Sequence, residues 1–277
     1  MAGQMSEQCN RECSSCGRDC GERKGAQDLS APPNAASRIG RVVAVASGKG
    51  GVGKSLVATM LAVAASRAGR RVGILDADVT GPSIPAAFGI SCGALRSDDG
   101  IEPACSAGGV RVISLNMLVE NPTDPVVWRG PVIAGVVKQF WTDVHWGELD
   151  VLFVDMPPGT GDVPLTVFQS LPVDGVVVVS SPQGLVETIV SKSVRMAGMM
   201  HKPVLGLVEN MSYMKCPGCG RTASVFGDSR AEGLARRFSI PRTVRLPLDP
   251  AIAAAIDSGA AETLEIPELD EFAAAVC

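Results

Sequence analysis

The chain has 277 residues, 46% of them hydrophobic, with a formal net charge of −4 and an isoelectric point near 5.3. That length can bury one large core or a core with an appendage, and the acidic balance argues against an electrostatic nucleic-acid binder. The polar start, 1–8, lacks the apolar segment of a signal peptide, and no apolar run approaches the roughly 18 to 20 residues that cross a bilayer. We therefore expect a soluble, cytoplasmic protein without a membrane or nucleic-acid partner.

Four cysteines near the N-terminus follow the pattern C-x3-C-x2-C-x3-C. Cytosolic thiols stay reduced, so clustered cysteines there usually bind metal. Four thiolates this close together can surround one metal centre, and the spacing approaches that of bacterial ferredoxins, where the fourth cysteine serves another cluster. A 4Fe–4S cluster, a zinc ion and a labile cluster loaded only during transfer are all open for this site. Its residues are Cys9, Cys13, Cys16 and Cys20.

Beyond these cysteines, short apolar strands alternate with helical segments. The alternation is typical of a doubly wound α/β fold with a mainly parallel sheet, whose ligands bind at the carboxyl ends of the strands. We predict a cysteine-rich extension at 1–23, a linker without apolar period at 24–37, and a main α/β domain at 38–277. The predicted strands are 41–47, 71–76, 151–155, 174–180, 203–209 and 243–246. The predicted helices are 54–68, 131–144, 163–170, 184–199, 228–238 and 249–257, and a smaller β-hairpin is expected at 100–115.

The first predicted strand runs into a glycine-rich loop that fits the phosphate-binding pattern G-x-x-x-x-G-K-[ST] and opens onto a helix. Glycines let the backbone aim successive N–H groups at a phosphate, and the helix N-terminus adds positive potential. A glycine-rich turn without a ligand is the alternative, but the strand–loop–helix context favours a nucleotide triphosphate. Lys54 is expected to reach the terminal phosphates, and the Ser55 hydroxyl to ligate magnesium. The site residues are Gly48, Lys49, Gly50, Gly51, Val52, Gly53, Lys54, Ser55 and Leu56.

Carboxylates follow two of the predicted strands. Asp76 and Asp78 lie at the end of the second strand, where acidic groups of a phosphate-loop fold lie near the γ-phosphate. We assign Asp78 to positioning the attacking water, with Asp76 in support; capping of a turn is the alternative for Asp76. Asp155 ends an apolar strand in the form of a Walker B element, which predicts a contact with magnesium through water. Asn210 follows the strand at 203–209, where an amide can contact the base.

A second cysteine pair, Cys216 and Cys219, lies in the sequence C-P-G-C-G and supplies two thiolates, too few for a closed tetrahedral site. Two chains around a two-fold axis would supply four, enough for a 4Fe–4S cluster or one zinc ion. The spacing does not separate these two, since Cys-Pro-x-Cys-Gly also has the form of half a zinc ribbon.

The loop carries an extra lysine, Lys49, at its second position. This arrangement resembles the deviant Walker A loop of the MinD, ParA, ArsA and nitrogenase-iron-protein superfamily. That resemblance implies a lysine that crosses a dimer interface to the other subunit's nucleotide, and therefore a homodimer. Over nearly the whole domain at 38–277, the ordered motifs resemble the Mrp/ApbC family, whose members are P-loop ATPases. They are the loop at 48–55, D-A-D and G-P-S-I-P at 76–85, W-R-G-P at 128–131, D-M-P-P-G-T-G-D at 155–162, S-P-Q at 181–183, N-M-S at 210–212 and C-P-G-C-G at 216–220.

Membership of that family implies an ATP-dependent iron–sulfur cluster carrier or scaffold. By the same resemblance the nucleotide is ATP, with Asn210 and the turn at 246–250 around the adenine. Cys216 and Cys219 of two chains then hold a bridging 4Fe–4S cluster, which is passed to apo iron–sulfur proteins. The N-terminal cysteines depart from the family, whose members with an N-terminal cluster usually space these residues more widely.

Two other functions share parts of this pattern. An ATP-gated electron donor resembling the nitrogenase iron protein would use the same loop and a bridging cluster, but its cysteines are usually far apart in sequence. A MinD- or ParA-like positioning switch with structural zinc would carry a basic DNA surface or a basic amphipathic membrane helix, and neither is evident in the sequence.

Overall fold

A computed structural model of the chain describes residues 30–78, 81, 83–97, 100–118, 130–183 and 186–277. The predicted extension at 1–23, with its metal-site cysteines Cys9, Cys13, Cys16 and Cys20, lies outside these residues. The first part of the predicted linker lies outside them as well.

Within the described residues, a nine-stranded sheet forms the middle layer, in the order β12-β11-β10-β2-β9-β3-β7-β6, with β13 paired to β11. Neighbouring strands are parallel except at β6 and β12, which run antiparallel to β7 and β11. The strands are β2 (Val42–Ala46), β3 (Val72–Asp76), β6 (Ala104–Cys105), β7 (Arg111–Ser114), β9 (Val151–Asp155), β10 (Gly175–Ser180), β11 (Val204–Lys215), β12 (Thr222–Ala223) and β13 (Thr243–Pro247). Two small pairs lie beside the sheet, β1 (Arg38–Ile39) with β8 (Glu148–Leu149), and β4 (Leu95–Ser97) with β5 (Gly100–Glu102).

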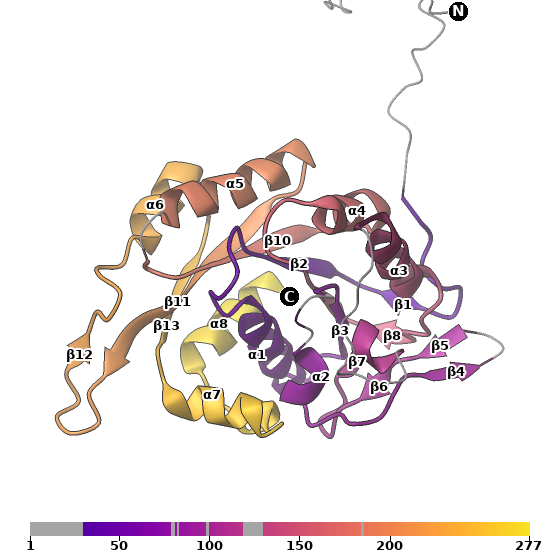
Figure 1. The fold of residues 1–277 in the computed structure, drawn as a ribbon, viewed down its shortest axis with the longest axis horizontal. Helices are drawn as coiled ribbons and strands as arrows, with labels where there is room; N and C mark the ends of the chain where they lie inside the picture. The colour runs from indigo at the N-terminus through magenta and orange to yellow at the C-terminus, as the bar shows by residue number, and fades with distance from the viewer. Residues whose placement is uncertain (1–29, 79–80, 82, 98–99, 119–129, 184–185) are drawn as a thin grey trace, which may run out of the picture.

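Helices cover both faces of the sheet (Figure 1). One face carries α3 (Gly130–Thr142), α4 (Asp162–Ser170), α5 (Val186–Met199) and α6 (Ala231–Phe238). The other carries α1 (Lys54–Arg67), α2 (Ile84–Ala87), α7 (Pro250–Asp257) and α8 (Pro267–Val276), with the short 3-10 turns η1 (Leu115–Met117) and η2 (Ala261–Thr263). Each face has its own apolar core, so the prediction of a doubly wound α/β fold is confirmed.

The central strand β2 shows why the sequence folds this way. Its five residues are all buried, and they alternate between the two cores: Val43 and Val45 pack on the α1 side, and Ala44 packs on the α3 and α4 side. A strand covered on both faces reads as a continuous apolar run without polar alternation. Because β2 lies between β9 and β10, its carboxyl end delivers the phosphate-binding loop to the middle of the sheet edge.

The hairpin expected at 100–115 is present as strands β6 and β7, and the structure adds pairings that the sequence did not predict. Strand β5 pairs with β4, upstream of the predicted range, while β6 and β7 form the antiparallel pair. Strand β7 also joins the main sheet as the parallel neighbour of β3, so that Ser114 lies opposite Asp76. The reason is burial: Val112 and Ile113 are both fully enclosed, each in a different core, which demands a strand covered on both faces.

The last part of the predicted linker belongs to the folded domain. Ala31 is buried; its N–H donates to the Ser170 carbonyl at 2.9 Å, and its own carbonyl accepts from the Trp141 indole at 2.8 Å. Ser37 is also buried, and its hydroxyl donates to the Val144 carbonyl. The chain is therefore docked onto α3 and α4 from Ala31 onward.

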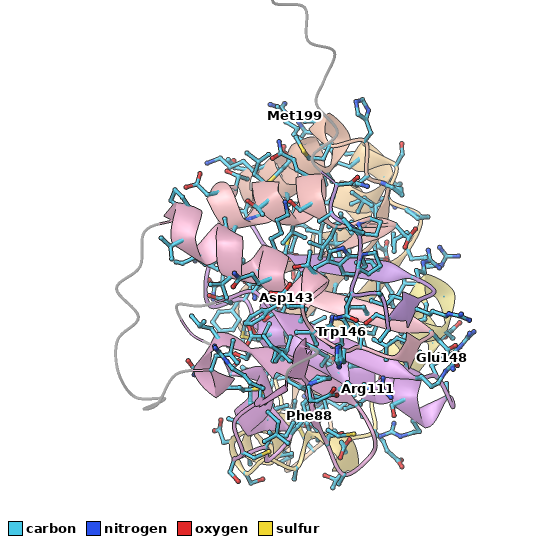
Figure 2. All side chains as sticks on the ribbon, turned by 90° about the vertical axis from the view of Figure 1, so that its right-hand side faces the viewer. Phe88, Arg111, Asp143, Trp146, Glu148 and Met199 are labelled. Carbon is cyan, nitrogen blue, oxygen red and sulfur yellow. The ribbon has the colours of Figure 1, made fainter. Side chains whose placement is uncertain are left out.

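Figure 2 shows the face beside α3, where Trp146 lies next to Arg111. Trp146 is fully enclosed, its indole N–H donates to the Phe140 carbonyl at 3.0 Å, and the Arg111 guanidinium donates to its backbone carbonyl. These contacts give Trp146 a packing role. No helix in the described ranges combines the length and the apolar character of a membrane span.

Candidate nucleotide site and cysteine arm

The glycine-rich loop lies at the carboxyl end of β2 and leads directly into α1, whose N-cap is Gly53. Gly51 and Gly53 both adopt a left-handed backbone with φ 78°. Such a backbone strains residues that carry a Cβ, and it turns successive N–H groups toward a common centre. With the open end of α1 behind it, the loop forms an anion-binding concavity.

Gly53 is also required by a close neighbour. A Cβ at this position would lie 2.2 Å from the side-chain nitrogen of Asn210. That nitrogen donates to the Val52 carbonyl at 3.0 Å, and Asn210 is buried. The residue predicted to contact the base therefore braces the phosphate loop from behind; a contact with the base stays a prediction.

Lys54 joins the loop to the carboxylates expected around it. Its ammonium lies 2.6 Å from Asp155 Oδ1 and 3.5 Å from Asp78 Oδ2, and it donates to Ser55 Oγ at 3.2 Å. The Ser55 hydroxyl in turn donates to Asp155 Oδ2 at 2.5 Å. Three strand ends thus bring Lys54, Asp78 and the predicted magnesium ligands into one cluster, whereas the third predicted catalytic residue, Lys49, lies apart from it.

Asp76 lies beneath this cluster, opposite Asp155 on the neighbouring strand. Its Oδ1 accepts from the Asp78 N–H at 3.1 Å, whereas its Oδ2 has no hydrogen-bond partner among the described residues. Burial, followed by the charge of Asp155, raises the pKa of Asp76 well above its ordinary value, and burial also raises the pKa of Asp155. Two carboxyl groups stacked at the loop, one with an unused oxygen, are a donor set suited to a hard divalent cation.

We expect Asp76→Asn to stabilise the protein at neutral pH while impairing hydrolysis. Because the folded-state pKa values of Asp76 and Asp155 exceed the reference value of 3.8, these groups contribute most to stability below about pH 4 and lose that contribution as pH rises through the folded-state values. Asparagine removes one buried charge and keeps the oxygen that accepts from Asp78. The free energy of unfolding, measured by urea titration from pH 4 to pH 8, should fall less steeply with pH in the variant. The control is Asp257→Asn, at an exposed position, and an unchanged pH slope in Asp76→Asn would contradict the expectation.

A cavity of about 300 Å³ opens above the loop. Most of the predicted loop residues line it, together with Asp78, whereas Asp76, Asp155, Val52 and Asn210 lie behind its wall. Gly48 packs against α5, where a Cβ would lie 2.6 Å from the Ile189 carbonyl. Lining residues that sequence reasoning missed are Ser47, Ser83, Pro158 and Ile256. The position of Pro158 shortly after Asp155 could have indicated that it lines the nucleotide cavity. No sequence pattern around Ile256 indicates this, since α7 reaches the cavity only through the tertiary fold.

Lys49 lies at the exposed rim of this cavity. Its ammonium donates to Gln183 Oε1 at 3.1 Å, across from the loop to the segment after β10. Its side chain is exposed to solvent. A cation so placed is free to meet a second molecule that approaches this edge of the sheet.

The second cysteine pair lies at the end of an arm, defined here as residues 213–230. Strand β11 runs on past the edge of the sheet, and its last residues pair antiparallel with β12 in a hairpin that leaves the body of the molecule (Figure 1). The turn closes through a bond from the Cys216 N–H to the Arg221 carbonyl and another from the Gly220 N–H to the Cys216 carbonyl, both 2.9 Å. All residues from 217 to 228 are exposed. The predicted strand at 203–209 is therefore shorter than the observed strand β11, which continues to Lys215.

The turn prepares Cys216 to act as a metal ligand. Hydrogen bonds from the backbone N–H groups of Cys219 and Gly218 lower the pKa of the Cys216 thiol, which favours the thiolate that binds metals. Across the described ranges, no group of three or more histidine, cysteine or acidic side chains is arranged to hold a metal ion. Within those ranges one chain thus offers two thiols on an exposed turn, and a tetrahedral site there requires ligands from elsewhere.

A buried carboxylate holds both ends of the arm, and sequence reasoning missed it. Glu209, in β11, is fully enclosed; its Oε2 accepts from Ser212 Oγ at 2.6 Å and its Oε1 accepts from the Arg230 N–H at 3.2 Å. Between these anchors, β11 shifts register against β13, and Met211 takes a left-handed φ of 55°. The arm therefore leaves the sheet through a bulge that adjoins Asn210, the brace of the phosphate loop.

Fold, loop and carboxylate cluster together define a phosphate-loop NTPase with the parallel sheet of the MinD and ParA proteins. A family model described as ParA, NUBPL iron-transfer P-loop NTPase, matches residues 38–276, and the chain belongs to that family.

Relatives and solved structures agree with this assignment. A protein from Clostridium perfringens named iron-sulfur cluster carrier protein is 42% identical, covering 91% of this chain and 90% of the relative. A Drosophila grimshawi protein named cytosolic Fe-S cluster assembly factor Nubp2 homolog is 39% identical over 83% of this chain and 90% of its own. The solved nucleotide-binding protein from Archaeoglobus fulgidus, in complex with ADP, superposes with a TM-score of 0.75 at 43% identity, covering 83% of this chain and 90% of that one. The cell division ATPase MinD of Pyrococcus furiosus, at 18% identity and a TM-score of 0.61, shares the fold.

Proposed function

We propose that this protein is an ATP-dependent iron–sulfur cluster carrier that holds a 4Fe–4S cluster between two copies of the chain and transfers it to apo-proteins. The observation that carries the proposal is the cysteine arm: the exposed thiol of Cys219 and the half-buried thiol of Cys216, whose pKa is lowered, lie at the end of the strand that also braces the phosphate loop. Relatives named as cluster carriers and cytosolic assembly factors support it, and support the cytoplasm as its location.

The nucleotide in this proposal is ATP, held by the N–H groups of the loop and by Lys54. Ser55 and Asp155, with Asp76 behind them, offer the oxygen ligands that magnesium prefers, and the bound ion would neutralise charge on the phosphates. On binding, Lys54 exchanges part of its contact with Asp155 for phosphate oxygens. Asp78 positions the water whose oxygen attacks the γ-phosphorus, and ADP leaves as the bond to the γ-phosphoryl group breaks.

The partner in this proposal is a second copy of the chain. It supplies Lys49 to the opposite nucleotide and a second pair of Cys216 and Cys219 to the cluster. The cluster is cargo, and four thiolates from two chains complete the coordination that two cannot. The N-terminal cysteines Cys9, Cys13, Cys16 and Cys20 are proposed to bind a second cluster or zinc.

Lys49→Ala should retain ATP binding and lose most hydrolysis. The lysine makes no contact with the loop's own carboxylate cluster, so its loss leaves the binding groups in place while removing charge stabilisation that a partner supplies. Residues acting in this way are worth about 10³-fold or more in phosphoryl transfer. Binding is measured by titration with a fluorescent ATP analogue, and turnover by phosphate release. Turnover equal to that of the wild type would refute the role in trans.

The proposal is tested by purifying the full chain without oxygen and measuring iron, acid-labile sulfide and zinc. About two iron and two sulfide per chain are expected from one bridged 4Fe–4S cluster per dimer, and about six of each if the N-terminal cysteines hold their own. Stoichiometric zinc without sulfide, persisting after reconstitution with iron and sulfide, would replace the carrier with an ATP-dependent switch that uses structural zinc. A cluster that changes redox state with ATP but is never transferred would instead favour an electron donor.

A further inference from the structure

The charge of this chain is unevenly distributed. The segment 215–245, called here the basic segment, holds seven basic and two acidic residues, a formal charge of +5 within a chain of −4. The rest of the chain is therefore strongly acidic. The basic residues are Lys215, Arg221, Arg230, Arg236, Arg237, Arg242 and Arg245, and the acidic ones are Asp228 and Glu232.

All seven basic side chains are exposed: Lys215 and Arg221 lie on the cysteine arm, and the other five lie where the arm ends or on the elements that follow it. Arg230 ends the arm and begins α6, Arg236 and Arg237 lie in the last turn of α6, and Arg245 lies in β13. In Figure 1 these elements occupy the same side of the molecule as the arm. The basic segment therefore begins beside the cysteines and continues from the arm onto α6 and β13.

The surface that these residues form is hollowed. A cavity of about 570 Å³ between α6 and β13 is lined by Arg230, Arg236, Arg237 and Arg245, with Glu187 and Glu232 among them. A second hollow of about 610 Å³ shares Glu232 and Arg245 and continues to Arg242, Tyr213 and Phe272. Together they make a groove from the base of the arm toward α8.

Some of the arginines are already held in place, and others are free to bind. Arg245 donates to Ser212 Oγ at 2.8 Å and stacks 5.7 Å from the centre of the Tyr213 ring. Arg236 is only loosely paired with Glu232, at 3.8 Å. The side chains of Arg230 and Arg242 form no ion pair with any residue in the described ranges. The groove thus combines fixed donors with cations that lack an acidic partner.

We propose that the basic segment is the docking surface for an acidic face of the protein that receives the cluster. This inference rests on the proposed carrier function and names the chemistry of its partner. Arginine presents a planar fork of donors that matches a carboxylate. A basic groove on the body of the protein, next to the arm that holds Cys216 and Cys219, would bring an acidic acceptor to the exposed end of that arm. Val225 and Phe226, exposed on the returning limb of the same arm, add apolar contact beside the basic residues.

The pattern of charge favours a protein over a nucleic acid or a second copy. Glu187 and Glu232 interrupt the arginines, and Glu268 and Glu271 border the second hollow, so a continuous phosphate backbone would meet repulsion along the groove. Separate carboxylates of a protein can lie between these acidic positions. A second copy presents the same positive segment, and like charges disfavour association through α6.

The expected effect is on the rate of encounter. Single exposed ion pairs are worth about 0 to 1 kcal/mol, so no one arginine should dominate affinity. A field of several like charges raises association rates by about 10- to 10³-fold, and it is screened over roughly 8 Å at physiological salt. Transfer to an acidic acceptor should therefore slow as salt is added.

The test uses the full-length dimer loaded with cluster and a bacterial apo-ferredoxin, a small acidic protein, as the probe. Arg230→Glu with Arg236→Glu should lower the second-order transfer rate at low salt by about tenfold or more and abolish its dependence on salt. The matched control, Arg96→Glu with Lys138→Glu, makes the same change in net charge at exposed positions of β4 and α3, on the other side of the molecule, and should leave the rate within about twofold of wild type. If the reversal variant unfolds, Arg230→Gln with Arg236→Gln takes its place and should show a smaller loss of the same kind.

A second measurement separates docking from transfer. Binding of the cluster-free protein to apo-ferredoxin, followed by chemical-shift changes in the labelled ferredoxin, should weaken in the reversal variant and not in the control. Transfer or binding that is equal in both variants overturns the docking proposal while leaving the carrier function intact. Salt-sensitive binding without any transfer from the wild type sustains the docking surface and counts against the carrier function. Loss of binding to duplex DNA or anionic vesicles in the reversal variant, with unchanged ferredoxin binding, would assign the groove to a phosphate polymer or a lipid surface.

Discussion

Lys54→Ala is expected to abolish ATP binding, with the dissociation constant weakened by roughly 100-fold or more. Hydrogen bonds to charged groups contribute about 1.5 to 3 kcal/mol each, so the loss of two contacts with phosphate is enough for this effect. The ammonium lies among Asp155, Asp78 and Ser55 at the opening of α1, where it lines the cavity above the loop. Without Lys54, the acidic groups beneath the loop would repel the phosphates.

The measurement is a titration with a fluorescent ATP analogue, accompanied by a thermal unfolding curve. Removing Lys54 leaves the buried Asp155 without its ion-pair partner, a change that can cost about 3 to 5 kcal/mol of stability. Lys54→Met keeps most of the side-chain volume and separates loss of binding from loss of fold. Lys49→Ala, in the same loop, is the control that should still bind. A folded Lys54 variant that binds ATP within about threefold of wild type would contradict the assignment of the loop.

Cys216→Ser is expected to remove the bridging cluster and leave the ATPase domain folded. The hydroxyl is a poor ligand for iron, and the turn at 216–220 lies on an exposed arm whose loss of metal exposes no core residue. Iron and sulfide should each fall by about two per chain relative to wild type, and transfer to an apo-acceptor should stop. Any metal at the N-terminal cysteines is unaffected, so the difference between the two proteins is the quantity to measure.

The matched control for this variant is Cys105→Ser. Cys105 is exposed, and it lies in β6 at the opposite end of the sheet from the arm. It should keep the full complement of iron and sulfide. Equal iron, sulfide and transfer in the wild type and in Cys216→Ser would show that the arm has no part in the proposed function. ATP binding is measured in each variant to show that the ATPase domain has folded.

The fold class and the phosphate loop could be predicted from the sequence because each depends on residues that are close together in the chain. The apolar run at Val42–Ala46 suffices to predict a strand covered on both faces, and the glycines and lysine that follow can serve an anion without reference to distant residues. The aspartates that end β3 and β9 could be placed near the loop because parallel strands deliver their carboxyl ends to one edge. The cysteine pair was visible for the same reason, since its chemistry lies in five consecutive residues.

What the tertiary structure decided depends on contacts between residues far apart in the chain. Asn210 turned out to brace the Val52 carbonyl, and Ile256 to line the cavity, through approaches that no local pattern encodes. Strand β7 of the hairpin expected at 100–115 also joined the main sheet, because Val112 and Ile113 face different cores and both faces are covered only once β3 is beside the strand. Glu209 looks in sequence like any strand-end acid, yet burial makes it the anchor of the whole arm. The sequence by itself determined which chemistry the chain carries, because that chemistry resides in short runs of residues; folding decided how the phosphate loop, the bulge and the cysteines are joined, because only packing brings those runs together.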